Sequence, residues 1–166
     1  MALTALPDGG WLIDDSFKGT LETIDAALDV LALVPGRRLV VIGDVSEPVG
    51  SQGPIYRRLG ARLAGMADVV ITLGHGHQRF AAGAVRAGMP RHALIDAGHD
   101  YRVALAQLQA VRRPGDVILV KGRTPQRLAR LALALAGRDV RCGIQECRLN
   151  ELTCSRCAML ERSWSG

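Results

Sequence analysis

Lysine and aromatic residues are scarce in this sequence. Of its 166 residues, Lys18 and Lys121 are the only lysines, and phenylalanine, tryptophan and tyrosine together make up 4%. The net charge of +5 therefore comes almost entirely from arginines, which are spread along the chain without a basic run that contains aromatics. Because a nucleic-acid interface needs clustered phosphate contacts, we expect no nucleic acid partner. An anionic small ligand accounts for a modest positive field equally well.

Long apolar runs are also missing. No uninterrupted apolar stretch approaches the roughly 20 residues that cross a bilayer, and the first residues, MALTALPDGG, lack the basic region and apolar core of a secretory signal. We therefore expect a cytoplasmic protein with no membrane partner. The sequence has no G-x-x-x-x-G-K-[ST] segment either, so it cannot supply its own P-loop for nucleotide phosphates.

Short β-branched runs alternate with amphipathic helical patterns between Gly10 and Asp139. Three of the runs are apolar on both faces, which is typical of a buried parallel sheet. This pattern predicts an open, mostly parallel α/β sheet with right-handed crossovers. Thr124 as a cap and Pro125 as the first residue predict the start of the fifth helix. The predicted strands are WLID (11–14), RLVVIG (38–43), DVVITLG (68–74), HALID (92–96) and DVILVKG (116–122).

Polar residues follow each predicted strand, and parallel sheets bind ligands at the carboxyl ends of their strands. For most of these loops, capping and solvation are a sufficient explanation. Two segments favour a site: Asp15 with Lys18, and VILVKGRT, since a lysine after so apolar a strand is costly unless it meets an anion. Lys121 and Arg123 beside a helix N-terminus predict a carboxylate or phosphate site. The polar residues after the five strands are Asp14, Asp15, Ser16, Lys18; Asp44, Ser46, Glu47; His75, His77; Asp96, His99; and Lys121, Arg123, Thr124.

Three motifs, in this order, resemble the C-terminal domain of Mur ligases. LIDDSFKGTLETIDAALDVLALVPGRRLVVIGDVSE is similar to its start, most of all in the subgroup that adds D-alanyl-D-alanine to the UDP-muramoyl tripeptide. In that subgroup Asp-Asp-Ser-Tyr-Asn-Ala-Asn precedes a helix and Gly-Asp-Met follows the next strand. PGDVILVKGRTPQRL is similar to the closing Pro-Gly-Asp-Val-Val-Leu-Val-Lys-Gly-Ser segment. The resemblance runs from Leu12 to Leu135 and implies a Rossmann-like α/β domain over residues 1–139, with helices on both faces of the sheet.

The resemblance also implies a division of labour. In that family, one domain holds the UDP-sugar, a central domain holds the P-loop and magnesium, and the C-terminal domain closes over both with the incoming amino acid or dipeptide. ATP activates a carboxylate as an acyl phosphate, which the incoming amine attacks in peptidoglycan precursor synthesis. The expected partners are thus the N-terminal and central domains of the same ligase and an amino acid or D-alanyl-D-alanine-like acceptor. The chain alone is expected to be inactive.

Roles for individual residues follow from the resemblance. Asp15 and Ser16 would contact ATP, Lys18 would face the phosphates or the acyl phosphate, and Asp44 would help to position the incoming amine. The resemblance places the incoming carboxylate on a further group, Lys121 with Arg123 or Thr124. Phe17-Lys18-Gly19-Thr20 is closer to the Ser-Lys-Ala-Thr segment of the glutamate-adding members, so the identity of the acceptor stays open.

Residues 140–166, the cysteine tail, have no clear period and carry all four cysteines, in a C-x4-C-x6-C-x2-C pattern. The resemblance does not cover this tail. Its final C-x2-C and two further cysteines predict a structural zinc site, with an iron–sulfur cluster and free or oxidised thiols as alternatives. A non-enzymatic alternative for the whole chain is a ligase-derived binding module whose zinc-stabilised tail docks on a partner. The zinc ligands would be Cys142, Cys147, Cys154 and Cys157.

Overall fold

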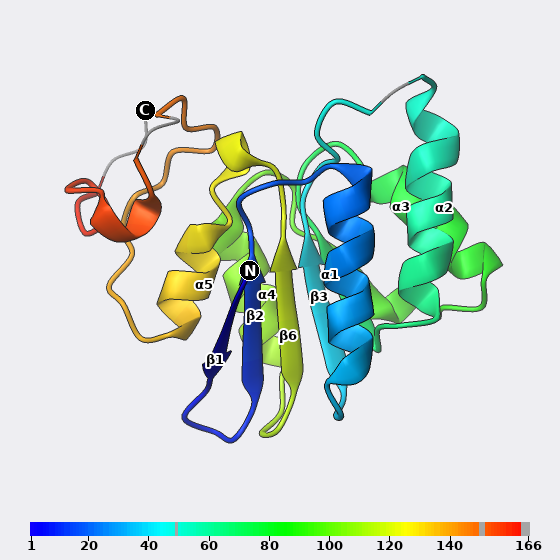
Figure 1. Ribbon diagram of the computed structural model, residues 1–166, viewed down its shortest axis with the longest axis horizontal. Helices are drawn as coiled ribbons and strands as arrows, with labels where there is room; N and C mark the ends of the chain where they lie inside the picture. Colours follow the sequence, from blue (N-terminus) through cyan, green and yellow to red (C-terminus); the bar gives the residue numbers. More distant parts are fainter. Residues whose placement is uncertain (49, 150–151, 164–166) are drawn as a thin grey trace.

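Five of the six strands coincide with the predicted β-branched runs. The computed structural model describes residues 1–48, 50–149 and 152–163, and its sheet has the strand order β1-β2-β6-β3-β4-β5 (Figure 1). All neighbouring strands pair in parallel except β1, which pairs antiparallel with β2 at one edge. The strands are β1 (Ala2–Ala5), β2 (Trp11–Asp15), β3 (Arg38–Ile42), β4 (Val69–Thr72), β5 (Leu94–Asp96) and β6 (Val117–Lys121).

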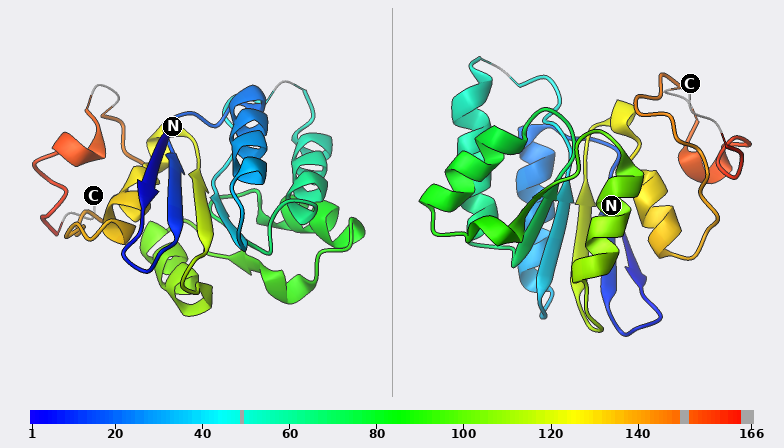
Figure 2. Two further views of the ribbon diagram at one scale, coloured as in Figure 1. Left: turned by 60° about the horizontal axis from the view of Figure 1, so that its bottom comes forward. Right: turned by 180° about the vertical axis from the view of Figure 1, so that it is seen from behind.

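Helices cover both faces of the sheet, as predicted. The chain moves in one direction from β2 to β5 and then returns to β6, so right-handed crossovers place α4 on the face opposite α1 (Figure 2). No helix among the described residues is long and apolar enough to span a membrane. The helices are α1 (Leu21–Leu33), α2 (Gln52–Ala64), α3 (His77–Arg86), α4 (Tyr101–Val111) and α5 (Ala129–Leu135), with 3-10 turns η1 (Arg91–Ala93), η2 (Thr124–Gln126) and η3 (Cys154–Arg156).

Alternate residues of the central strands contribute to two apolar clusters. Val40 and Ile42 of β3 pack with residues of α1, α2 and α3, whereas Leu39 and Val41 pack with residues of α4 and α5. Every residue of β6 is buried. This double burial explains why the strand runs are apolar on both faces, and it holds the strand ends in a fixed register.

The fifth helix begins later than the sequence predicts. Thr124–Gln126 forms the turn η2, Arg127 adopts a left-handed conformation with φ 50°, and α5 starts only at Ala129. The Thr124 hydroxyl donates to the Phe17 carbonyl oxygen and caps no helix. The prediction of a helix capped by Thr124 was therefore wrong, because this segment bonds to the neighbouring loop. The strand β1 was not predicted at all, since its four residues are exposed and show no apolar alternation.

The cysteine tail folds back beside α5 (Figure 1). The backbone N–H of Cys147 donates to the Pro125 carbonyl oxygen at 2.8 Å, which ties the tail to η2. The N–H groups of Arg141 and Cys142 both donate to the Leu160 carbonyl oxygen, at 2.8 and 3.0 Å, and so join the two arms of the tail. The turn η3 is the one helical or strand element that the structure describes in residues 140–149 and 152–163.

Candidate functional site

A buried ion pair joins the carboxyl ends of β2 and β6. Asp15 lies directly opposite Lys121 in the parallel register, and Lys121 Nζ donates to Asp15 Oδ2 at 2.6 Å and also to the Lys18 carbonyl oxygen. The Lys121 side chain is 1% exposed. The anion that this lysine needs is therefore supplied by the protein, from the neighbouring strand.

The loop after β2 packs tightly against the loops after β3 and β6. Ser46 N–H donates to the Gly19 carbonyl oxygen at 2.7 Å, and a Cβ on Gly19 would lie 3.1 Å from backbone atoms of Asp44 and Arg123. Lys18 of the same loop is exposed, and it takes part in none of the ion pairs found between described residues. The loop therefore keeps its backbone against the neighbouring loops and presents Lys18 outward.

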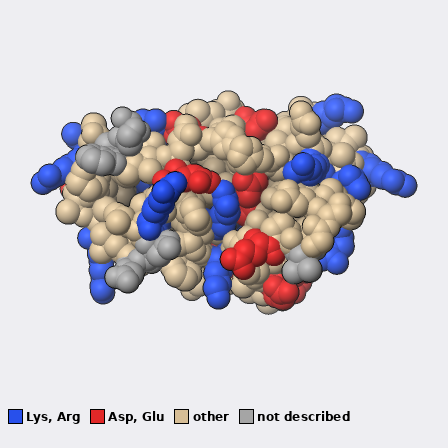
Figure 3. All heavy atoms as spheres, turned by 90° about the horizontal axis from the view of Figure 1, so that it is seen from above, with Lys and Arg blue, Asp and Glu red and all other residues tan. Residues whose placement is uncertain are grey.

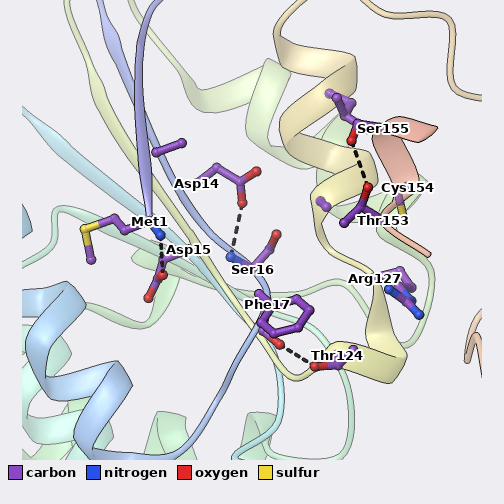
Figure 4. Close-up of a pocket in the computed structure, with 13 residues that line it drawn as sticks. Met1, Asp14, Asp15, Ser16, Phe17, Thr124, Arg127, Thr153, Cys154 and Ser155 are labelled. Atoms are coloured by element: carbon purple, nitrogen blue, oxygen red, sulfur yellow. Dashed lines mark hydrogen bonds and ion pairs between the residues drawn. The ribbon is translucent and has the colours of Figure 1, made fainter. Parts of the chain in front are cut away.

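The first cavity lies between the end of β2, η2, α5 and the tail (Figure 4). Its volume is about 290 Å³. Asp14 Oδ1 accepts a hydrogen bond from the Ser16 N–H at 3.1 Å, and Asp15 Oδ1 lies 3.3 Å from the amino group of Met1. The residues that line this cavity include Asp14, Asp15, Ser16, Thr124 and Arg127.

Among the acidic residues that follow the strands, Asp44 is buried, with an exposed fraction of 6%. Its Oδ1 accepts from the Tyr56 hydroxyl at 3.4 Å, and its Oδ2 accepts from the His75 N–H at 3.2 Å. Burial raises the pKa of Tyr56, which keeps its hydroxyl protonated as a donor to Asp44. Gly74 has φ +115°, and a Cβ there would stand 2.3 Å from Asp44 Oδ2. Only glycine therefore fits beside this carboxylate.

Gln126 connects Asp44 to the other strand ends. Its Oε1 accepts from the Asp44 N–H at 2.9 Å and its Nε2 donates to the Leu73 carbonyl oxygen at 3.0 Å, so it bridges the ends of β3 and β4. Neither Gln126 nor Tyr56 could be selected from the sequence, because a glutamine in a loop and a tyrosine on a helix are common. Their importance comes from the tertiary contacts alone.

The second cavity, of about 320 Å³, opens on the other side of η2. The rings of His75 and His99 lie close together there, with their centres 4.3 Å apart and their planes tilted by 58°. Glu146, from the tail, closes this cavity and pairs with Arg123 Nη2. The side chains that line it include Asp44, His75, His99, Gln126 and Glu146.

Arg123 keeps an unused donor. Its Nε is buried and has no hydrogen-bond partner among the described residues, while its side chain as a whole is 31% exposed. Seen from above the strand ends, acidic side chains run through the middle of this face with Lys and Arg side chains beside them (Figure 3). The edge therefore offers both carboxylates for a cationic group and an arginine for an anionic one.

Two more of the polar residues that follow the predicted strands bond to neighbouring residues of their own segment. His77 Nδ1 lies 2.7 Å from the Thr72 hydroxyl, and Asp96 accepts from the Gly98 N–H at 2.9 Å within its own turn. Within residues 1–48, 50–149 and 152–163, no three His, Cys, Asp or Glu side chains stand ready-made around a metal position.

Comparison with known proteins agrees with the fold and the motifs. Residues 2–124 match the family model described as "Mur ligase, glutamate ligase domain". The UDP-N-acetylmuramoyl-tripeptide–D-alanyl-D-alanine ligase of Mycobacterium bovis is 32% identical over 163 residues, which cover 86% of this chain and 32% of the relative. The ligase of that name from Synechocystis is 32% identical over 113 residues, 66% of this chain and 24% of the relative. The chain thus spans about a quarter to a third of these relatives.

Solved structures share the fold. MurF from Acinetobacter baumannii superposes with a TM-score of 0.69 at 22% identity, over 82% of this chain and 30% of that one. MurF ligase from Thermotoga maritima, in complex with ADP, superposes with a TM-score of 0.61 at 18% identity, over 81% and 30%. The fold is that of a mostly parallel α/β domain. The chain belongs to the Mur ligase family and corresponds to its C-terminal domain.

Proposed function

We propose that this chain is the substrate-closing domain of an ATP-dependent Mur-type ligase, which joins a D-alanyl-D-alanine-like dipeptide or an amino acid to a UDP-muramoyl peptide. The observation that carries the proposal is the pair of cavities on the two sides of η2. Thr124 lines the first and Gln126 lines the second. A ligase that activates one substrate with ATP and joins it to an acceptor needs the nucleotide side and the acceptor side to meet in this way. Because the reaction consumes ATP, we place it in the cytoplasm.

The first cavity fits the nucleoside part of ATP. Asp14, Asp15 and Ser16 offer oxygen atoms suited to ribose hydroxyls, and Arg127 lines the same cavity. The ADP bound to the Thermotoga maritima relative supports a nucleotide at this fold. Since the chain lacks a P-loop, we assign the triphosphate and magnesium mainly to the central domain. Lys18, exposed at the rim, would reach the phosphates when the domains close.

The second cavity suits the incoming amine and carboxylate. Asp44, held by Tyr56 and His75, presents a fixed carboxylate to an ammonium group. Arg123 is partly exposed and reaches this cavity through Glu146, which pairs with its Nη2, so we assign the acceptor carboxylate to Arg123 in place of Glu146. Thr124 and Lys121 act through position: Thr124 bonds to Phe17, and Lys121 bonds to Asp15 and Lys18. We therefore propose Lys121 as a positioning residue that sets the shape of the loop after β2.

The chemistry would follow from this placement. The peptide carboxylate takes the γ-phosphoryl group of ATP and forms an acyl phosphate, and ADP leaves. The acceptor amine, after losing a proton, attacks the acyl carbon, and the tetrahedral intermediate expels phosphate to give the amide. Bringing amine and acyl phosphate together supplies most of the expected rate gain, so the isolated domain would be inactive.

The test uses the complete ligase with all three domains. Replacing Arg123 by Ala should raise the KM for the acceptor by about 10- to 100-fold, the value of a charge-assisted hydrogen bond, whereas Asp44→Asn should lower kcat/KM for the amine. Arg138→Ala is the matched control, because Arg138 pairs with Glu161 away from both cavities. Lys121→Ala and Asp15→Ala should reduce turnover with the fold retained by circular dichroism. Unchanged kinetics in folded Lys121→Ala and Asp15→Ala enzymes would refute the site assignment.

A further inference from the structure

All four cysteines line one small cavity. Cys142 and Cys147 lie in the arm that follows α5, and Cys154 and Cys157 lie at η3 in the returning arm. The cavity has a volume of about 50 Å³. Each cysteine is partly buried, and none forms a disulfide. One pair of cysteines from each arm of the tail thus lines the same space between the tail and α5.

Two buried arginines line the same cavity. Arg127 is 5% exposed and Arg130 is 2% exposed. Arg130 Nη1 donates to the Cys142 carbonyl oxygen at 3.1 Å and lies 3.7 Å from Cys142 Sγ. Its guanidinium also lies over the Tyr101 ring, 4.4 Å from the ring centre.

Among the described residues, no carboxylate lies at ion-pair distance from either guanidinium group. Neither arginine takes part in an ion pair there, and Arg127 Nε and Nη2 are buried without a hydrogen-bond partner. A buried guanidinium without an anion is strongly disfavoured. Carbonyl oxygens of Arg127, Gln126 and Leu152 accept from the two guanidinium groups, but with four neutral thiols neither group would have an anion at ion-pair distance among the described residues.

We propose that Cys142, Cys147, Cys154 and Cys157 bind one Zn²⁺ as thiolates, and that Arg127 and Arg130 neutralise the resulting site. Four thiols lose four protons and no electron moves. The zinc tetrathiolate carries two negative charges, which the two guanidinium groups balance. Thiolate sulfur is a preferred zinc ligand, and the C-x2-C pair is typical of structural sites.

The sulfurs must draw together around the ion, since no three of them already stand at metal-binding geometry in the described residues. The tail can make this change because little else fixes it: Leu160 is its one buried apolar side chain among residues 140–149 and 152–163. Binding energy from the metal would then order a segment too short for its own core.

Zinc binding would also act on the second cavity. Cys147 directly follows Glu146, which pairs with Arg123, and Cys147 N–H bonds to Pro125 of η2. A zinc-bound Cys147 would hold Glu146 beside Arg123, so the metal would set how readily an acceptor carboxylate displaces it. This consequence rests on the proposed function, whereas the zinc site does not.

The full chain, purified under reducing conditions, is tested by elemental analysis and thiol titration. We expect about one zinc per chain, four thiols that react only after a chelator removes the metal, and a tetrahedral cobalt–thiolate spectrum when Co²⁺ replaces zinc. Cys157→Ser and Cys142→Ser should lose the metal, while Ser155→Ala, in the same segment, should keep it. Because cysteine variants can misfold, the cobalt spectrum of the unaltered chain decides independently of them.

The arginine roles are tested by competition with a chelator. Arg130→Met and Arg127→Met should weaken zinc binding by about 10- to 100-fold, as expected for groups that support metal ligands, and Arg138→Met should leave it unchanged. Metal-free protein with four reactive thiols after incubation with zinc, a disulfide, or bound iron would overturn the zinc site. Unchanged zinc affinity in both folded arginine variants would overturn the charge compensation. These measurements need no ligase activity, so they stand apart from the test of the proposed function.

Discussion

The sheet domain, residues 1–139, and the cysteine tail are held together in different ways. In the sheet domain, two apolar clusters cover both faces of a continuous sheet. In the described part of the tail, residues 140–149 and 152–163, Leu160 is the only buried apolar side chain, and order comes from hydrogen bonds to Pro125 and between the two arms. A long chain of alternating elements can build a core, whereas a short one needs directional bonds or a metal.

The largest expected effect is in the sheet domain, at the contact between α2 and α3. A Cβ on Gly83 would lie 1.9 Å from the Arg57 carbonyl oxygen, so Gly83→Val must push the two helices apart. We expect a loss of about 4 kcal/mol in the free energy of unfolding, measured by urea denaturation. Gly65→Ala, at the end of α2, is the control, because its Cβ would meet only Arg62 O at 3.6 Å. Equal stability of the two variants would contradict this account of the core.

A smaller and local effect is expected in the tail. Leu160→Ala removes its buried anchor, so we expect the tail to detach at a cost of about 2 kcal/mol. Hydrogen exchange should speed up at the amides of Arg141 and Cys142, which bond to the Leu160 carbonyl, and stay slow in β6. If exchange in β6 accelerates equally, the two regions form one cooperative unit and the contrast between them fails.

The smallest effect returns to the sheet domain, at the start of α4. Asp100 accepts from the Arg102 N–H at 2.9 Å as the N-cap, and the hydrogen bond from the Arg102 side chain holds the pKa of Asp100 below its usual range. Asp100→Ala should cost about 1 kcal/mol at neutral pH. A lowered carboxyl pKa stabilises the fold above the unfolded value of about 3.9, and this contribution is lost as pH falls through the folded pKa.

Thermal unfolding of Asp100→Ala and the unaltered chain between neutral and acidic pH checks this sign. The difference between them should shrink below about pH 4, where the Asp100 carboxyl of the unfolded chain begins to be protonated while that of the folded protein stays ionised. Asp100→Asn is the matched control, since asparagine caps helices without a charge. It should keep most of the stability and lose the pH dependence. A difference that grows on acidification would show that the Asp100 charge does not stabilise α4.

The sheet was predictable because its elements repeat a simple pattern. Short, β-branched runs such as VILVK, with glycine on both sides, favour buried parallel strands, and the helical spacing between them favours an α/β fold. The strand β1 was not predicted, because pairing with β2 makes it a strand, whereas its residues are exposed and show no burial pattern. The start of α5 was predicted wrongly because Thr124 and Gln126 bond to other loops. These contacts are stronger than the local preference of Thr124 for a helix cap.

The site was predictable as an edge but not as a set of contacts. The cost of a lysine after an apolar strand predicted an anionic ligand beside Lys121, which stays a prediction, and the sequence could not show that Asp15 pairs with this lysine. Gln126, Tyr56 and Glu146 carried no local signal, although they hold Asp44 and close the second cavity. The charge and hydrogen-bonding capacity of a side chain can be read from the sequence, whereas its bonding partners depend on which strand ends become neighbours.

The sequence by itself determined the periodic burial of the sheet domain, the edge where polar residues collect and the likeness to Mur ligases, because these depend on short-range spacing. Tertiary structure alone decided that Lys121 meets Asp15, that η2 separates two cavities, and that four cysteines share one cavity with Arg127 and Arg130. Each of these joins residues from separate segments, and the free energy of burying a charge is set by its neighbours in space, which the order of residues does not specify.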